Sequence, residues 1–165
     1  SGAVAKPGIY EVEFGITLRQ LIDLGGGMRG GSTMQAILLG GAAGGFVGPN
    51  DLDLPLTMEA TRAAGSSLGS GVVMVLDQSV DMVDQLRRIA AFFRDESCGQ
   101  CVPCRVGTVR QEEIVSRLAK GVQSQDIELL RELGTVMRDA SICGLGQTAN
   151  SAIDSAINKL KVFAV

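Results

Sequence analysis

Four cysteines form the pattern in this sequence with the clearest chemical meaning. Cys98, Cys101 and Cys104 are each separated by two residues, and Cys143 follows much later in the chain. Three closely spaced thiolates and one distant thiolate are a common ligand set for a cubane [4Fe–4S] cluster. Zinc more often uses two separated pairs of cysteines, and three thiols within one short segment cannot readily form disulfides with one another. The spacing therefore favours an iron–sulfur cluster over a zinc site, and both over disulfides.

The residues around the cysteines fit such a cluster. Pro103 suits the first turn of a helix, so Cys101 and Cys104 are predicted at a helix N-terminus, where free N–H groups and the positive end of the dipole favour thiolates. Arg105 either adds positive charge beside an anionic cluster or is an ordinary solvated or ion-paired arginine. Nearby glycines would let the backbone approach inorganic sulfide; they are Gly99, Gly144 and Gly146.

The composition excludes several other classes of chemistry. The chain of 165 residues contains no histidine, which removes histidine catalysis, Cys/His zinc fingers and haem ligation by imidazole. Its 15 basic and 18 acidic residues do not make the basic footprint of nucleic-acid binding. We expect no secretory signal and no membrane insertion, because no apolar run approaches the roughly 20 residues that span a bilayer. No nucleophile–base pair can be assembled, so we expect a globular protein with no catalytic residue of its own.

Glycine and charge divide the chain into two predicted modules. Most of the 22 glycines lie in residues 1–77, whereas most charged residues and all four cysteines come later. We predict an α+β module over residues 1–78, followed by a helical module over residues 79–165 that carries the cluster.

The elements of the first module are compatible with a β-grasp order in which one early strand stays unassigned. Apolar and alternating runs predict three strands, over residues 8–14, 36–39 and 72–76. A capping-box pattern at Thr17–Gln20 begins a short helix, which the glycines at 25–27 end. A second short helix covers residues 58–64. The glycine-rich stretch 40–48 is predicted as a loop rather than a phosphate cradle, because no Lys-Ser/Thr follows it.

The second module has a clear helical period. Apolar residues at intervals of three and four predict amphipathic helices over residues 81–94 and 103–120, another that Ser124 caps, and a fourth over residues 149–160. Four short helices with brief connections predict a four-helix bundle.

Two cysteine-containing segments resemble a known protein family. Residues 96–108, ESCGQCVPCRVGT, and residues 141–148, SICGLGQT, closely resemble the flavoprotein subunit of respiratory complex I. Its relatives are the diaphorase subunits of NAD-reducing hydrogenases and NAD-dependent formate dehydrogenases. Upstream, residues 39–46 and 69–73 look like the same family's β-grasp module, of the soluble-ligand-binding type. The resemblance therefore covers nearly the whole chain.

The resemblance implies a function and a set of partners. In that family NADH reduces FMN by hydride transfer, and electrons leave singly through a [4Fe–4S] cluster whose ligands correspond to Cys98, Cys101, Cys104 and Cys143. The implied partners are an FMN/NADH-binding domain, a thioredoxin-like [2Fe–2S] subunit and a larger iron–sulfur subunit. We expect a cytoplasmic protein, one that can lie peripherally on the cytoplasmic side of a membrane complex.

The family's glycine-rich NADH- and FMN-binding half normally precedes the β-grasp module, and this sequence begins at that module. We therefore expect the C-terminal half of such a subunit, either a fragment or a separately encoded piece, which would oxidise no NADH alone. Two other hypotheses stay open at this point. One is a structural or interaction module with a four-cysteine zinc site, and the other is a ligand-binding β-grasp domain with a vestigial tail.

Overall fold

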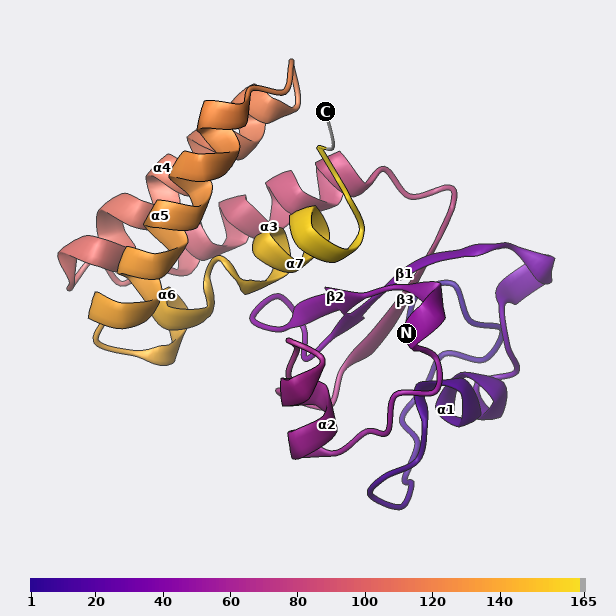
Figure 1. The fold of residues 1–165 in the computed structure, drawn as a ribbon. Coiled ribbons are helices and arrows are strands. Elements are labelled where there is room, and N and C mark those ends of the chain that lie inside the picture. Colours follow the sequence, from indigo (N-terminus) through magenta and orange to yellow (C-terminus); the bar gives the residue numbers. More distant parts are fainter. Residues whose placement is uncertain (164–165) are drawn as a thin grey trace. The chain divides into compact units, whose positions relative to one another are not determined.

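The computed structural model describes residues 1–163 and divides the chain into two compact units, Ser1–Val80 and Asp81–Val165 (Figure 1). The first unit combines a small sheet with short helices, and the second is helical. Each unit is described below by itself.

The sheet of the first unit has three antiparallel strands. They are β1 (Met34–Leu39), β2 (Gly45–Val47) and β3 (Val73–Asp77), and their spatial order is β2-β1-β3. Leu38 of the central strand pairs with Phe46 on one side and Met74 on the other. The N-terminal residues lie parallel to β3, where the Ala3 N–H donates to the Val75 carbonyl at 2.8 Å. Ile37 and Leu39 lie on one face of β1, two residues apart, and both enter the core of this unit.

Short helices complete the first unit. Helix α1 (Leu18–Leu24) begins at the predicted capping box, in which Thr17 and Gln20 each bond the other's backbone N–H, and Gly25 is its C-cap. Helix α2 (Met58–Ala63) is capped by the Thr57 hydroxyl. Two 3-10 turns, η1 (Arg29–Gly31) and η2 (Pro49–Asp51), lie between the larger elements. The core gathers side chains from α1, the sheet and the connecting loops: Val4, Leu18, Ile22, Ile37, Leu39, Val47, Leu56 and Val75.

Two predictions for this unit were wrong. Residues 8–14 form no strand: none of their backbone N–H groups donates a hydrogen bond within the described residues, and Ile9 is fully exposed. Their alternating sequence suits a strand, but the N-terminal residues take the place beside β3, so the segment has no partner. The stretch predicted as a glycine-rich loop, 40–48, contains strand β2. Gly40 in this stretch lets the backbone pass close to another loop, since a Cβ there would lie only 2.8 Å from the Ser67 carbonyl oxygen.

The second unit has five helices in the described residues: α3 (Met82–Glu96), α4 (Val102–Leu118), α5 (Ser124–Ala140), α6 (Gly144–Thr148) and α7 (Ser151–Lys159). The four longer ones are those that the apolar period predicts. The short α6 was not predicted, and it begins directly after Cys143. Ser124 is the first residue of α5 and not its cap, because Gln123 takes that position without a side-chain hydrogen bond.

Polar contacts join the helices around an apolar centre. Leu86, Ile114 and Ile153 are fully or almost fully buried there. The buried amide of Gln111 on α4 donates to the Ala149 carbonyl at 3.0 Å, which ties α4 to the C-cap of α6. At the edges, ion pairs join α3 to α4 (Arg94–Glu112) and α4 to α5 (Arg117–Asp126). None of the helices in residues 1–163 has the length and apolar character that a membrane crossing requires.

Candidate iron–sulfur site

The first three cysteines lie on the turn that connects α3 to α4. Ser97 ends α3, and Cys101 is the N-cap of α4, with its carbonyl accepting from the Arg105 N–H at 2.9 Å. Pro103 occupies the first turn of α4, where its missing N–H costs no helical hydrogen bond. Cys104 therefore lies in the first turn of the helix, as the sequence predicts.

The fourth cysteine lies on the turn that connects α5 to α6. Ser141 ends α5, and Cys143 is the N-cap of α6. The turn is held by the side chain of Gln147, whose amide donates to the Ser141 carbonyl at 3.0 Å. The chain therefore places Cys143 at a helix start, as it does Cys101.

The two cysteine turns contact each other. The backbone N–H of Ile142 donates to the Cys101 sulfur, and this bond, with a second from the Cys104 N–H, lowers the pKa of the Cys101 thiol from its ordinary value. Gly146 packs against the other turn, because a Cβ added there would lie only 2.9 Å from the Cys104 Cβ. Residues 141–146 thus lie directly against Cys101 and Cys104.

The four thiols differ in exposure. Cys104 is buried and Cys101 is half-buried, whereas Cys98 and Cys143 are exposed, and all four are free of disulfides. Within residues 1–163, no three side chains of histidine, cysteine, aspartate or glutamate gather closely enough to hold a metal ion as they stand. The structure therefore brings together the turns that carry the cysteines, and the four-thiolate ligand set stays a prediction.

The surroundings suit sulfur ligands that carry negative charge. The Ser97 hydroxyl lies 3.3 Å from the Cys104 sulfur. Gly99 adopts a φ of 74°, a left-handed conformation that glycine tolerates best, and its carbonyl accepts from the Arg105 guanidinium at 3.1 Å. Arg105 is thereby held at the cysteine turn. A Cβ on Gly144 would meet no described atom within 4 Å, so this position is open beside Cys143.

Three residues of the site carry no signal that spacing could reveal. Ser97, Ser141 and Ile142 approach the cysteine sulfurs through hydroxyls or a backbone N–H. Ser141 is 7% exposed and helps to lower the pKa of the Cys101 thiol, yet its hydroxyl completes no hydrogen bond with any described residue. The sequence could have indicated these residues only by their position, since each lies within two residues of a cysteine.

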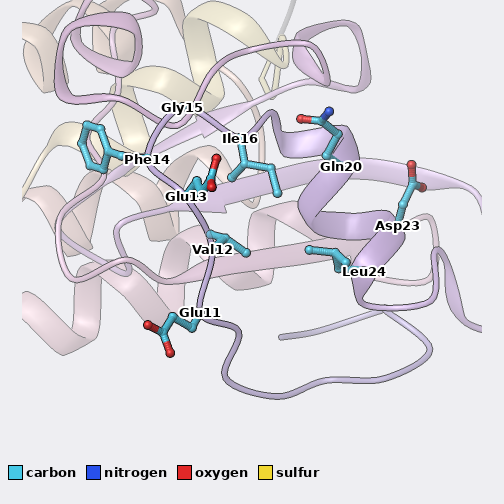
Figure 2. Close-up of a pocket in the computed structure, with 9 residues that line it drawn as sticks. All are labelled: Glu11, Val12, Glu13, Phe14, Gly15, Ile16, Gln20, Asp23 and Leu24. Carbon is cyan, nitrogen blue, oxygen red and sulfur yellow. The ribbon is translucent and has the colours of Figure 1, made fainter.

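The first unit has a separate cavity of about 890 Å³, which Figure 2 shows between segment 11–16 and helix α1. Val12, Ile16 and Leu24 turn toward the cavity, while Phe14 points away from the helix. Three acidic residues are also among those that line it, Glu11, Glu13 and Asp23. Of the described residues around it none is a cysteine, so this cavity is distinct from the thiol site.

The sequence matches two known protein families, one over each unit. Residues 84–162 match the NADH-ubiquinone oxidoreductase-F iron–sulfur binding region, and residues 1–52 match the SLBB domain. Residues 84–162 therefore belong to this family of iron–sulfur binding regions, and residues 1–52 to the SLBB family. The SLBB match lies within the first unit, and the iron–sulfur match includes all four cysteines of the second.

Individual relatives extend over nearly the whole chain. The NADP-reducing hydrogenase subunit HndC of Solidesulfovibrio fructosivorans is 38% identical, over 96% of this chain and 33% of its own length. The NADH-quinone oxidoreductase-F subunit of Mycobacterium bovis is also 38% identical, over 98% of this chain and 36% of its own. A crystal structure of an NAD⁺-reducing [NiFe]-hydrogenase matches with a TM-score of 0.86 and 33% identity, covering 99% of this chain and 28% of that one. The chain thus spans about a third of the length of the curated relatives.

Proposed function

We propose that this chain is the electron-transfer portion of the flavoprotein subunit of an NAD(P)H-linked oxidoreductase. In this proposal it receives single electrons from FMN and passes them through one [4Fe–4S] cluster to a partner iron–sulfur subunit. The observation that carries the proposal is the contact between the two cysteine turns, in which Ile142 bonds the Cys101 sulfur and Gly146 packs on Cys104. Residues distant in sequence are thereby held where one polynuclear centre can join them.

The ligands in this proposal are Cys98, Cys101, Cys104 and Cys143. A bound cluster would supply one-electron redox chemistry, for which the protein needs no acid or base. The chain's own residues hold the thiolates and donate hydrogen bonds to them, as the N–H groups of Ile142 and Cys104 do at Cys101. Such donors and the burial of Cys104 are the means by which a protein sets a cluster's potential.

The remaining parts of the proposal rest on the relatives. They include subunits of NADH-quinone oxidoreductases and of NADP- or NAD⁺-reducing hydrogenases. We infer that the partners are an FMN/NADH-binding domain, a thioredoxin-like [2Fe–2S] subunit and a larger iron–sulfur subunit, in a cytoplasmic assembly. We also infer that the two units are a β-grasp module and a four-helix bundle. The parallel bridge of the N-terminal residues to β3 and the four longer helices support this finer description.

Anaerobic reconstitution of the full chain tests the proposal directly. The chain should bind about four irons and four sulfides, show a broad absorbance that dithionite bleaches, and give an EPR signal when reduced. Cys143→Ser should lose this centre, whereas Val122→Ser, a matched change at a partly exposed position between α4 and α5, should keep it. One tightly held zinc without labile sulfide would overturn the proposal in favour of a structural zinc module.

A further inference from the structure

The buried hydroxyl of Ser141 lies at the centre of the contact between the two cysteine turns. It is placed beside Cys101, and Gly146 packs against it on the side that also faces the Cys104 Cβ. The side chain is 7% exposed, so water does not readily solvate it. Within the described residues its Oγ has no hydrogen-bond partner.

An unpartnered buried hydroxyl is costly, because it gives up hydrogen bonds to water and gains none in return. Ser155 shows the ordinary solution in the same unit: it is similarly buried, and its hydroxyl donates to the Ala152 carbonyl at 2.9 Å. Ser141 follows the last residue of α5, and its backbone N–H donates to the Met137 carbonyl at 3.1 Å, but its hydroxyl makes no hydrogen bond to that helix. Its hydroxyl is therefore available to an acceptor at the cysteine turn.

The missing acceptor has to be a sulfur. A Cβ on Gly146 would touch both the Ser141 side chain and the Cys104 Cβ, so the cysteine turn lies close to this hydroxyl, and the neighbouring Ile142 N–H already donates to the Cys101 sulfur. A thiolate or sulfide that carries negative charge accepts stronger hydrogen bonds than a neutral thiol does. A bound cluster would supply such acceptors at this place.

We propose that Ser141 is a positioning residue whose hydroxyl donates a hydrogen bond to a sulfur at the Cys101 corner of the bound cluster and so raises the cluster's reduction potential. This inference rests on the proposed function. A donor stabilises the reduced form more than the oxidised form, since the reduced cluster carries one more negative charge. Gly146 has a part in this arrangement, because any larger residue there would displace the hydroxyl.

The experiment compares Ser141→Thr with Ser141→Val, two nearly isosteric variants that differ in the hydroxyl. After anaerobic reconstitution, the potential of each is measured by EPR-monitored redox titration. The valine variant should be reduced about tenfold less favourably than wild type, which is about 59 mV for a one-electron couple. The threonine variant should stay close to wild type. Ser155→Ala, which removes a buried hydroxyl that already has a partner, is the control and should leave the potential unchanged.

Iron content separates the remaining outcomes. If valine abolishes cluster binding while threonine retains it, the hydroxyl itself is required and the inference stands. Equal potentials in the two variants, or loss of the cluster from both, would overturn the inference while leaving the proposed function intact. A wild-type chain that binds no cluster would overturn the proposed function and the inference with it.

Discussion

Replacing Gly146 by alanine should weaken the contact between the two cysteine turns, because the new methyl group has no room. An ideal Cβ at this position lies 2.9 Å from the Cys104 Cβ and closer still to the Ser141 side chain. Overpacking of this kind costs roughly 1–3 kcal/mol. Alanine is favoured over glycine in a helix by about 1 kcal/mol. The expected net loss in the free energy of unfolding is therefore up to about 2 kcal/mol.

The same short helix supplies the control. A Cβ on Gly144 meets no described atom within 4 Å, so Gly144→Ala has the same chemical change and the same helical gain without the clash. Its stability should equal that of wild type or exceed it slightly. Anaerobic urea unfolding of the full chain, followed by the helical circular dichroism signal, measures both variants. Iron content after reconstitution should fall for Gly146→Ala alone.

The two alanine variants can contradict this account in one clear way. If they unfold at the same urea concentration and retain the same iron, the segment after Cys143 does not pack on Cys104 as the structure places it. The contact that carries the proposed function would then be refuted, whatever the metal content of the wild-type chain.

Three further outcomes can be checked by unfolding and hydrogen exchange. The hydrogen bond from Arg117 lowers the pKa of Asp126 below its ordinary value of 3.8, so the stability from this pair is complete above that value and is lost as the pH falls through the lower folded pKa. Asp126→Asn should therefore be less stable than wild type at neutral pH, and the difference should shrink in acid urea titrations. Gln111→Ala should lose about 1–3 kcal/mol in urea unfolding, because it removes the buried donor to the Ala149 carbonyl. Removal of the metal should speed hydrogen exchange in residues 95–145 before the first unit changes, and the reverse order would count against the coupling of metal to fold.

The local signals in the sequence predicted the elements that position the cysteines. Pro103 and the cysteine spacing located the start of α4, and the capping box at Thr17 located α1, since both depend on bonds within one turn. The sequence predicted Gly144 and Gly146 as places where the backbone approaches inorganic sulfide, which stays a prediction. The two have different surroundings, open beside Cys143 and crowded beside Cys104, and spacing cannot distinguish these.

The errors come from contacts between distant parts of the chain. The segment 8–14 has the alternation of a strand, but a strand also needs a free edge, and the N-terminal residues already pair with β3. Strand β2 has three residues in a glycine run, too short to show a period. The hydrogen-bond donors of the site also depend on such contacts, so the sequence did not predict them. The Ile142 donor is a backbone N–H, and the Ser141 hydroxyl lies near a cysteine sulfur only because the two turns pack together.

The contact between the two cysteine turns also bears on how metal binding and folding are linked. Metal sites that are unformed without their ion gain all of their order from binding. Here the Ile142–Cys101 hydrogen bond and the packing of Gly146 on Cys104 already join the turns through protein contacts. Much of the entropy cost of closing the long chain segment between them is then met by the fold itself. Metal binding then has to order only the exposed thiols of Cys98 and Cys143. Loss of the metal should therefore loosen the two turns before the helices that carry them unfold.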